Sequence, residues 1–432
     1  MVSSPMISSF YSCLTGVGRP CGGRTAFLAV LVFLGLCFGA VEGFSARAAE
    51  RSWHNMPTGN GYGFQVFDRQ EGRINYFLEH PYRFVAPTDG TRTAGIGRRD
   101  LAHDIYFGLR VNGDATWLVS PSEISYLDES HIVHTKQGHK GVMAESYYFA
   151  PYGYEGNAMV MLLKLTNTTG SEVQAAAFAK PNLKLGLGRV EPGSKGENIL
   201  WQQVPFAHGV ETGPGGGHAI YAPIGEVSGV QCGQDAYLYD EVLKGSDLVT
   251  PTSCGVDDAV LVMQKDLSIP AETSVWWGVG VLFLNNNPTH EQASAFQDPR
   301  ILPEILSSWE AFVAERDASD ILTDSLEEME SWRSSNAPAE LTANEIRLWR
   351  QSETVLRMGQ VRERAKKNNG MPLAALPVGE WHTSWVRDGV YFVASTAATE
   401  HHEEARLALE FFLGTDSNTD GFFRNEMGMP YR

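Results

Sequence analysis

The stretch "PVGEWHTSWVRDGVYF" (residues 377–392) marks the point at which a loop gives way to a helix. Thr383 and Ser384 can both cap a helix, because a short hydroxyl side chain accepts hydrogen bonds from the unpaired backbone N–H groups of the first turn. The residues that follow contain no proline up to Thr399. We therefore predict a helix that starts close to Thr383 or Ser384 and ends near Thr399.

Further helical patterns lie on both sides of this stretch. Residues 341–370 have the apolar spacing of a long amphipathic helix, which residues 368–370, "NNG", would end because they tolerate the left-handed cap conformation. Residues 401–414 predict another helix, and residues 301–316 and 322–335 predict two earlier ones. The apolar face of the helix at 401–414 is expected to consist of Ala405, Ala408, Leu409 and Phe412.

The sequence before these helices has a different pattern. From Ser52 to about Asn287 it consists of short runs of branched and aromatic residues, separated by glycine, asparagine and proline. Many such runs without helices between them are typical of a large antiparallel β-sandwich. Four of the predicted strands are 158–167, 173–185, 259–267 and 273–284. The predicted fold is therefore a β-sandwich followed by helices.

Composition and charge limit the possible partners. The chain has 432 residues, of which 43% are apolar and 11% aromatic, so it can form two or three globular domains. Its formal net charge is −17, and it contains no run rich in lysine or arginine. A negative surface repels polyanions, so nucleic acid is disfavoured as a partner. A neutral or cationic ligand is compatible with this charge.

The N-terminal segment, residues 1–49, has the organisation of an export signal. Two arginines precede the uncharged, mostly apolar run 25–41, and residues 46–48, "ARA", have the small-residue spacing that signal peptidase accepts. We predict cleavage after this segment and a periplasmic or secreted protein, which meets the membrane only through its signal. The alternative is an uncleaved anchor, because about 20 apolar residues span a bilayer and this run is only slightly shorter.

Cys232 and Cys254 are the two cysteines that remain after the signal. An even number of cysteines in a loop-rich region of an exported chain favours a disulfide, so we predict this pair, with two free thiols as the alternative. No cysteine and histidine cluster has zinc spacing, and we expect no metal and no cofactor. Asn167 begins an N-glycosylation sequon, which matters only in a eukaryotic host.

Two further motifs are interpreted as structural. Residues 416–421, "DSNTDG", match the first half of a calcium-binding loop, but Met427 stands where the bidentate glutamate is needed. A polar turn after a helix is the preferred interpretation. His401 and His402 are interpreted as a solvated helix start.

Trp385, Arg387 and Asp388 have the chemistry of a corner that binds hydroxyl groups. A carboxylate accepts hydrogen bonds from two neighbouring hydroxyls, a guanidinium donates a fixed fork, and an indole offers a flat apolar face to a pyranose ring. Arg387 and Asp388 fall in the first turn of the predicted helix, which can face a cavity. The alternative is structural: the two charges form ion pairs or caps, and the tryptophans belong to the core.

The order of these segments resembles the opening of the catalytic domain of glucoamylase-like glycoside hydrolases, family 15 of the six-hairpin glycosidases. The resemblance rests on "LWRQSETVLRMGQ" (348–360), on residues 368–395 with Trp-x-Arg-Asp at 385–388, and on "EEARLALEFF" (403–412). It covers only the N-terminal portion of that domain. The β region resembles, in outline, the supersandwich that bacterial members carry before the barrel. Trp381 and His382 depart from the residues that usually precede the motif.

The resemblance implies an exported, inverting glycosidase that acts on α-glucosidic or related oligo- and polysaccharides from the non-reducing end. Arg387 and Asp388 would hold hydroxyls of the terminal sugar in subsite −1, and Trp385 would shape its wall. In the family the general acid and base come from later helices of an (α/α)6 barrel. We therefore expect both beyond residue 432, and we expect this sequence to be a fragment. Three carboxylates near the motif are not favoured for these roles: Glu380, Asp420 and Glu426.

Two other functions are compatible with the sequence. One is a sugar phosphorylase, since some phosphorylases combine a sandwich with an (α/α)6 barrel, although export argues against it. The other is a non-catalytic carbohydrate-binding protein, if the gene ends at residue 432. The predicted organisation is a signal peptide at 1–49, a β-sandwich domain at 50–298, a helical linker at 299–339 and the start of the glycosidase barrel at 340–432.

Overall fold

The computed structural model describes residues 54–82, 100–185, 196–213, 218–284, 301–334, 337–364, 368–378 and 384–414, together with three two-residue strands, 416–417, 423–424 and 430–431. The predicted signal peptide lies outside these residues, and so do Glu380, Trp381, His382, Asp420 and Glu426. Within the described ranges, no helix is both long enough and apolar enough to cross a bilayer.

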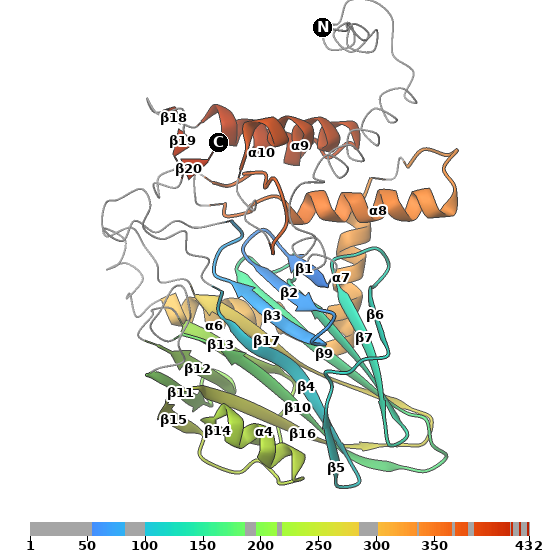
Figure 1. The fold of residues 1–432 in the computed structure, drawn as a ribbon, viewed down its shortest axis with the longest axis vertical. Coiled ribbons are helices and arrows are strands. Elements are labelled where there is room, and N and C mark those ends of the chain that lie inside the picture. The colour runs from blue at the N-terminus through green and yellow to red at the C-terminus, as the bar shows by residue number, and fades with distance from the viewer. Residues whose placement is uncertain are drawn as a thin grey trace, which may run out of the picture. The chain divides into compact units, whose positions relative to one another are not determined.

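Two antiparallel sheets precede the main helices (Figure 1). The eight-stranded sheet has the order β1-β2-β3-β4-β10-β16-β14, with β5 beside β4, and the nine-stranded sheet has the order β15-β11-β12-β13-β17-β9-β8-β7-β6. The strands of the first sheet are β1 (Asn55–Gly59), β2 (Phe64–Asp68), β3 (Arg73–Leu78), β4 (Ala102–Val111), β5 (Asp114–Trp117), β10 (Val173–Leu183), β14 (Gly229–Gln234) and β16 (Ala259–Ile269). Those of the second are β6 (Glu123–Tyr126), β7 (Val133–His139), β8 (Val142–Phe149), β9 (Asn157–Asn167), β11 (Glu197–Gln202), β12 (His208–Thr212), β13 (His218–Ile224), β15 (Ser253–Val256) and β17 (Ser274–Leu284).

The main core lies between the two sheets, and β10 shows how the sequence produces it. Ala177 and Ala179 belong to the cluster between the sheets, whereas Ala176 and Phe178 are buried on the opposite face. Successive side chains of a strand point to opposite faces, and both faces of β10 are covered, so residues 175–179 form an unbroken apolar run within the strand. The predicted β-sandwich is confirmed.

Helices α6 (Ile301–Val313) and α7 (Ala318–Trp332) cover the outer face of the nine-stranded sheet. Trp309 of α6 is fully buried, and a Cβ added to Gly280 of β17 would lie 2.1 Å from its ring. The indole therefore needs a glycine opposite it. These helices occupy the segment predicted as a helical linker, and they pack on the sandwich.

A disulfide between Cys232 of β14 and Cys254 of β15 joins an edge strand of one sheet to an edge strand of the other, with Cα atoms 5.9 Å apart. The glycosylation sequon is inaccessible in the folded chain. Asn167 is fully buried, and its Nδ2 donates hydrogen bonds to the carbonyls of Ser171, Ile269 and Pro270 at 2.7–3.1 Å.

Helix α8 (Ala343–Met358) ends well before the predicted end of the 341–370 helix. It starts with a capping box, as expected for an amphipathic helix. The prediction of its end is wrong because the following N–H groups bond elsewhere. Val361 donates its backbone N–H to the Met371 carbonyl at 3.0 Å, and Arg362 donates to the β1–β2 loop at 2.9 Å. A continuing helix would need these N–H groups for its own turns.

The predicted helix at the opening stretch is α9 (Val386–Ala398). Trp385 is its N-cap residue, and no side chain caps its first turn. Ser384 precedes that position, so capping by Ser384 is not observed, and Thr383 lies outside the described residues. The helix ends at Thr399, its C-cap, as predicted.

Helix α10 (His402–Leu413) packs against α9. The contact is close at Gly389, where an added Cβ would lie 2.3 Å from the Phe412 ring. The predicted apolar face of α10 is partly wrong. Leu409 is 46% exposed, whereas Phe411, which was not predicted, is 3% exposed and packs in a separate small core with Val361.

Candidate functional site

The first turn of α9 brings together the three residues predicted to bind hydroxyl groups. Nη2 of Arg387 donates to Oδ2 of Asp388 at 3.3 Å, and their side chains are 76% and 36% exposed. The guanidinium carbon of Arg387 lies 5.9 Å from the centre of a Trp385 ring. The three side chains thus form one group at the N-terminal end of the helix.

If Arg387 and Asp388 had only a structural role, they would contribute little to the stability of the fold. An exposed ion pair contributes about 0–1 kcal/mol. A carboxylate in the first turn of a helix adds about 0.3–1 kcal/mol through the helix dipole. Arg387 and Asp388 are therefore accessible charges, and removing them should lower the free energy of unfolding only slightly.

Large apolar side chains are exposed next to this group. Val390 and Tyr391 on α9 are 61% and 47% exposed, and Leu413 on α10 is 83% exposed. Tyr391 lies four residues after Arg387, which places both on one face of α9. The sequence analysis did not identify Tyr391 as an exposed neighbour of the Arg387–Asp388 pair. The Arg387–Tyr391 spacing is the signal that could have identified it.

A polar cluster joins α10 to α7 and α8. It consists of the buried Glu353 and His401 and the half-buried Trp332 and Glu404, and we call it the His401 cluster. The rings of His401 and Trp332 stack with centroids 3.9 Å apart and an angle of 2° between their planes. Nε2 of His401 lies 3.2 Å from Oε1 of Glu353, and the two residues are 6% and 1% exposed. The prediction that His401 is solvated is wrong, because residues distant in sequence cover it. His402 is exposed, as predicted.

Hydrogen bonds hold the carboxylates of this cluster. Glu353 accepts from the Ser334 backbone N–H at 3.0 Å and from Arg350 at 2.9 Å. Burial raises the pKa of Glu353, but the hydrogen bonds from His401, Ser334 and Arg350 outweigh it and hold the pKa below its usual value. Glu404 accepts from Trp332 Nε1 at 2.6 Å. Both carboxylates are committed to this packing, so neither is assigned as a general acid or base.

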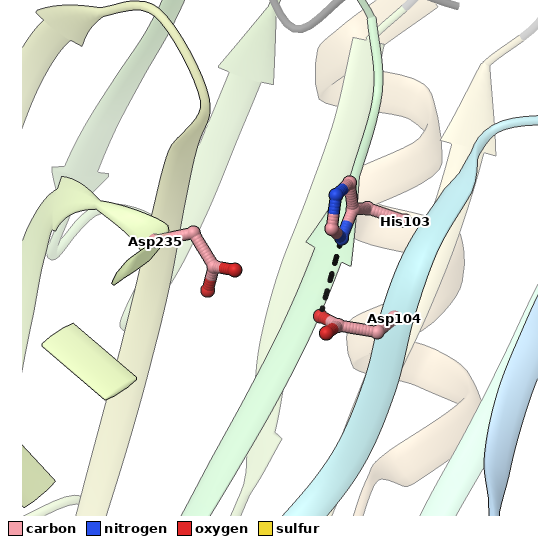
Figure 2. A group of neighbouring side chains, drawn as sticks. All are labelled: His103, Asp104 and Asp235. Atoms are coloured by element: carbon pink, nitrogen blue, oxygen red, sulfur yellow. Dashed lines mark ion pairs between the residues drawn. The ribbon is translucent and has the colours of Figure 1, made fainter. Parts of the chain in front are cut away.

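A second cluster resembles a metal site (Figure 2). His103 and Asp104 of β4 and Asp235, the first residue of α4 (Asp235–Leu243), place their potential ligand atoms within 4.8 Å of one another. The ammonium of Lys180 in β10 already bridges the carboxylates, 2.5 Å from Asp104 and 2.7 Å from Asp235. Arg73 also pairs with Asp104, at 3.0 Å. Two anions and two cations balance, so the group is an ion-pair network in which a metal ion would have to displace a buried ammonium.

The pKa values of this network follow from its contacts. Burial raises the pKa of Asp104, but the His103 hydrogen bond and the Lys180 charge outweigh it and bring the pKa to about 2. For Asp235, burial outweighs the Lys180 charge and raises the pKa. The hydrogen bond with Asp104 raises the pKa of His103.

Two carboxylates inside the sandwich are buried too completely to act on a substrate. Glu197 accepts hydrogen bonds from the backbone N–H groups of Leu185 and Ala259 at 2.8 and 3.2 Å. Glu211 accepts from the hydroxyl of Tyr221, and burial raises the pKa of Glu211 well above its usual value. Both glutamates are 0% exposed, so these groups support the core of the sandwich.

His131 is a buried neutral histidine where α8 meets the sandwich. It is 0% exposed, and Nε2 donates to the Ala150 carbonyl at 2.8 Å. Burial lowers its pKa to about 3, with the charges of Arg357 and Arg333 contributing in the same direction. The folded chain therefore keeps His131 uncharged at pH values where an unfolded chain would protonate it.

We expect this histidine to make the protein less stable in mild acid. Between its unfolded pKa of 6.5 and its folded pKa of about 3 the unfolded state binds the extra proton, so stability falls as the pH falls through this window. The loss from this one group is about 1.4 kcal/mol per pH unit. Urea unfolding at pH 7 and pH 5 should show a smaller difference for His131→Phe than for the wild type. His402→Phe, at an exposed histidine, should behave like the wild type, and equal pH dependence in all three proteins would contradict the prediction.

Comparison with known proteins gives matches in structure only. No family model and no curated protein sequence matches the chain. A bacterial glucoamylase complexed with acarbose is similar, with a TM-score of 0.49 and 12% identity over 83% of this chain and 49% of the glucoamylase. A protein described as a kojibiose phosphorylase from the human microbiome has a TM-score of 0.34 and 6% identity, over 73% and 37% of the two chains. A polysaccharide lyase has a TM-score of 0.32 and 14% identity, over 53% and 33%. This chain thus spans about half the length of the glucoamylase.

Proposed function

We propose that this protein is an exported glycoside hydrolase that releases sugar units from the non-reducing end of α-glucosidic or related saccharides, with inversion at the anomeric carbon. The observation that carries the proposal is the Trp385–Arg387–Asp388 group at the start of α9, whose two charged side chains are accessible. Its charges contribute little to the fold, and its chemistry matches sugar hydroxyls and a pyranose face.

In this proposal the three side chains bind the terminal sugar in subsite −1. Asp388 accepts hydrogen bonds from two hydroxyl groups, Arg387 holds the carboxylate in place and donates to a further oxygen, and Trp385 borders the ring. An inverting reaction also needs an acid that protonates the leaving oxygen and a base that activates water, about 6.5–9.5 Å apart. We assign neither to a described residue.

The surroundings of α9 support a larger helical domain around this site. The exposed apolar residues of α9 and α10 include Val390 and Leu413, and groups of this size are normally covered by packing or by a ligand. The further helices of an (α/α)6 barrel would cover them. This part of the proposal follows from the resemblance of residues 348–412 to family 15.

Export is the part of the proposal that concerns location. The charged, apolar and small-residue order of residues 1–49 is that of a signal peptide. The Cys232–Cys254 disulfide fits an oxidising compartment such as the periplasm or the extracellular medium. Peptide mapping of mature protein should find a start near Ala49 or Glu50.

Proton NMR of maltotriose incubated with the product of the complete gene tests the reaction. We expect β-glucose to appear first, because inversion of an α-linkage gives the β-anomer. Initial α-glucose would contradict the inverting mechanism, and glucose 1-phosphate formed only in phosphate buffer would identify a phosphorylase. Binding of maltotriose without any turnover would identify a non-catalytic carbohydrate-binding protein.

A further inference from the structure

Within the binding group at the start of α9, the two charged side chains are joined mainly to each other. Apart from their mutual ion pair, the hydrogen bonds described for Arg387 and Asp388 do not tie them to another element, and no side chain caps the first turn. The position of α9 is instead set by its packing on α10. At Gly389, one residue after Asp388, the two helices are so close that a Cβ would overlap the Phe412 ring at 2.3 Å. A shift of α10 would therefore move the first turn of α9.

Helix α10 is in turn fixed at its N-terminal end by the His401 cluster. His401 is the N-cap residue of α10, and its ring is held between the Trp332 indole and the Glu353 carboxylate. One turn later, Glu404 accepts from Trp332 Nε1 at 2.6 Å, and its carbonyl accepts from Gln360 at 2.8 Å. These contacts attach the first turn of α10 to α7 and to α8 and the segment after it.

The partners of His401 are themselves anchored on the sandwich. The guanidinium of Arg357 in α8 lies 4.5 Å from the Trp332 ring and 4.0 Å from the Tyr152 ring, which belongs to the loop between β8 and β9. Thr354 of α8 donates to the Glu129 carbonyl at 2.8 Å, in the loop between β6 and β7. A continuous series of contacts thus runs from the sandwich through α7 and α8 to α10.

We propose that His401, Trp332 and Glu353 form a positioning site that sets α10, and through it the orientation of Arg387 and Asp388 toward a saccharide. The inference rests on the proposed function for its ligand, but its mechanical part concerns α9 and α10 alone. His401 is the central member, because it is the residue at the start of α10 that contacts both Trp332 and Glu353. It does not touch the saccharide, so it is a positioning residue.

Two variants separate positioning from general stability. His401→Phe keeps an aromatic ring on Trp332 and removes the interaction with Glu353. His401→Gln keeps a donor for Glu353 and loses the ring. The matched control is His402→Phe, because His402 is the exposed neighbour on the same turn. Circular dichroism and thermal melting establish that each variant is folded.

Hydrogen exchange of the full chain, followed by mass spectrometry, tests the mechanical part. We expect faster exchange over residues 386–398 in His401→Phe, by about tenfold, and no change in His402→Phe. Exchange in α9 that is unchanged in His401→Phe would overturn the proposal. This measurement needs no ligand, so it decides the proposal even if the proposed function is wrong.

Titration calorimetry with maltotriose tests the link to binding. We expect His401→Phe to weaken binding about tenfold, because a misplacement of about 1 Å can cost about a hundredfold and a smaller one costs less, and we expect His401→Gln to recover part of the loss. A purely structural role would lower the melting temperature and leave the affinity of the folded variant unchanged, which would overturn the link. Absence of binding by the wild type would instead refute the proposed function, and hydrogen exchange alone would then decide the positioning role.

Discussion

In the product of the complete gene, replacing Asp388 with alanine is expected to lower kcat/KM for maltotriose by at least about a hundredfold. The carboxylate is accessible and, in the proposed function, accepts charge-assisted hydrogen bonds from two sugar hydroxyls. Each such bond is worth about 1.5–3 kcal/mol, and 1.4 kcal/mol corresponds to a factor of ten. Part of this interaction strengthens as the ring flattens toward the transition state, so kcat/KM should fall more than KM rises.

The melting temperature of the same sample distinguishes this role from a structural one. Asp388 pairs only with the exposed Arg387 among the contacts described and lies in the first turn of α9, so its loss should cost about 2 kcal/mol or less. Glu403→Ala provides a control, because Glu403 is an exposed carboxylate in the first turn of α10 that pairs with Arg406. A markedly lower melting temperature with unchanged kcat/KM in Asp388→Ala would show that the residue only supports the helix.

Replacing Lys180 with methionine is expected to destabilise the sandwich by about 3–5 kcal/mol, because it removes a buried cation shared by two carboxylates and leaves one of them unpaired. Lys180 is 0% exposed and bridges Asp104 and Asp235. After its loss Asp104 retains the ion pair with Arg73, whereas the ion pair of Asp235 is gone. Chemical denaturation of the wild type and the variant measures the difference in unfolding free energy.

Two further variants test the cause of this loss. Lys164→Met removes a partly exposed lysine that pairs with Glu145 at 3.2 Å, and we expect an effect of at most about 1 kcal/mol. Adding Asp235→Leu to Lys180→Met should recover part of the stability, because the uncompensated charge is removed. Equal losses for the two lysines, or no recovery in the double variant, would show that burial of the ion pairs does not set the cost.

The sandwich could be predicted from sequence because its strands carry a local signal. Strands β9 and β17 contain continuous apolar runs, at residues 158–163 and 275–284, because both faces of these segments are covered. The end of α8 could not be predicted in the same way. The backbone hydrogen bond from Val361 to Met371 lies in the segment after α8, and local helix propensity gives no indication of it.

The candidate site, too, could be predicted only where its residues are close in sequence. Trp385, Arg387 and Asp388 are close in sequence and share the first turn of a helix that the pattern predicts, so their proximity followed from spacing. The His401 cluster draws its members from three helices, and its burial depends on their packing. Lys180 bridges residues from β4 and α4 for the same reason. Contacts of this kind depend on tertiary structure and leave no short-range pattern.

Hydrogen exchange of the wild-type chain with and without maltotriose tests most directly whether the start of α9 binds a sugar. We predict slower exchange over residues 384–392 when maltotriose is bound, and no such protection in Asp388→Ala at the same concentration. Saccharide binding that protects other segments and leaves 384–392 unchanged would contradict the assignment of Trp385, Arg387 and Asp388 to the binding site.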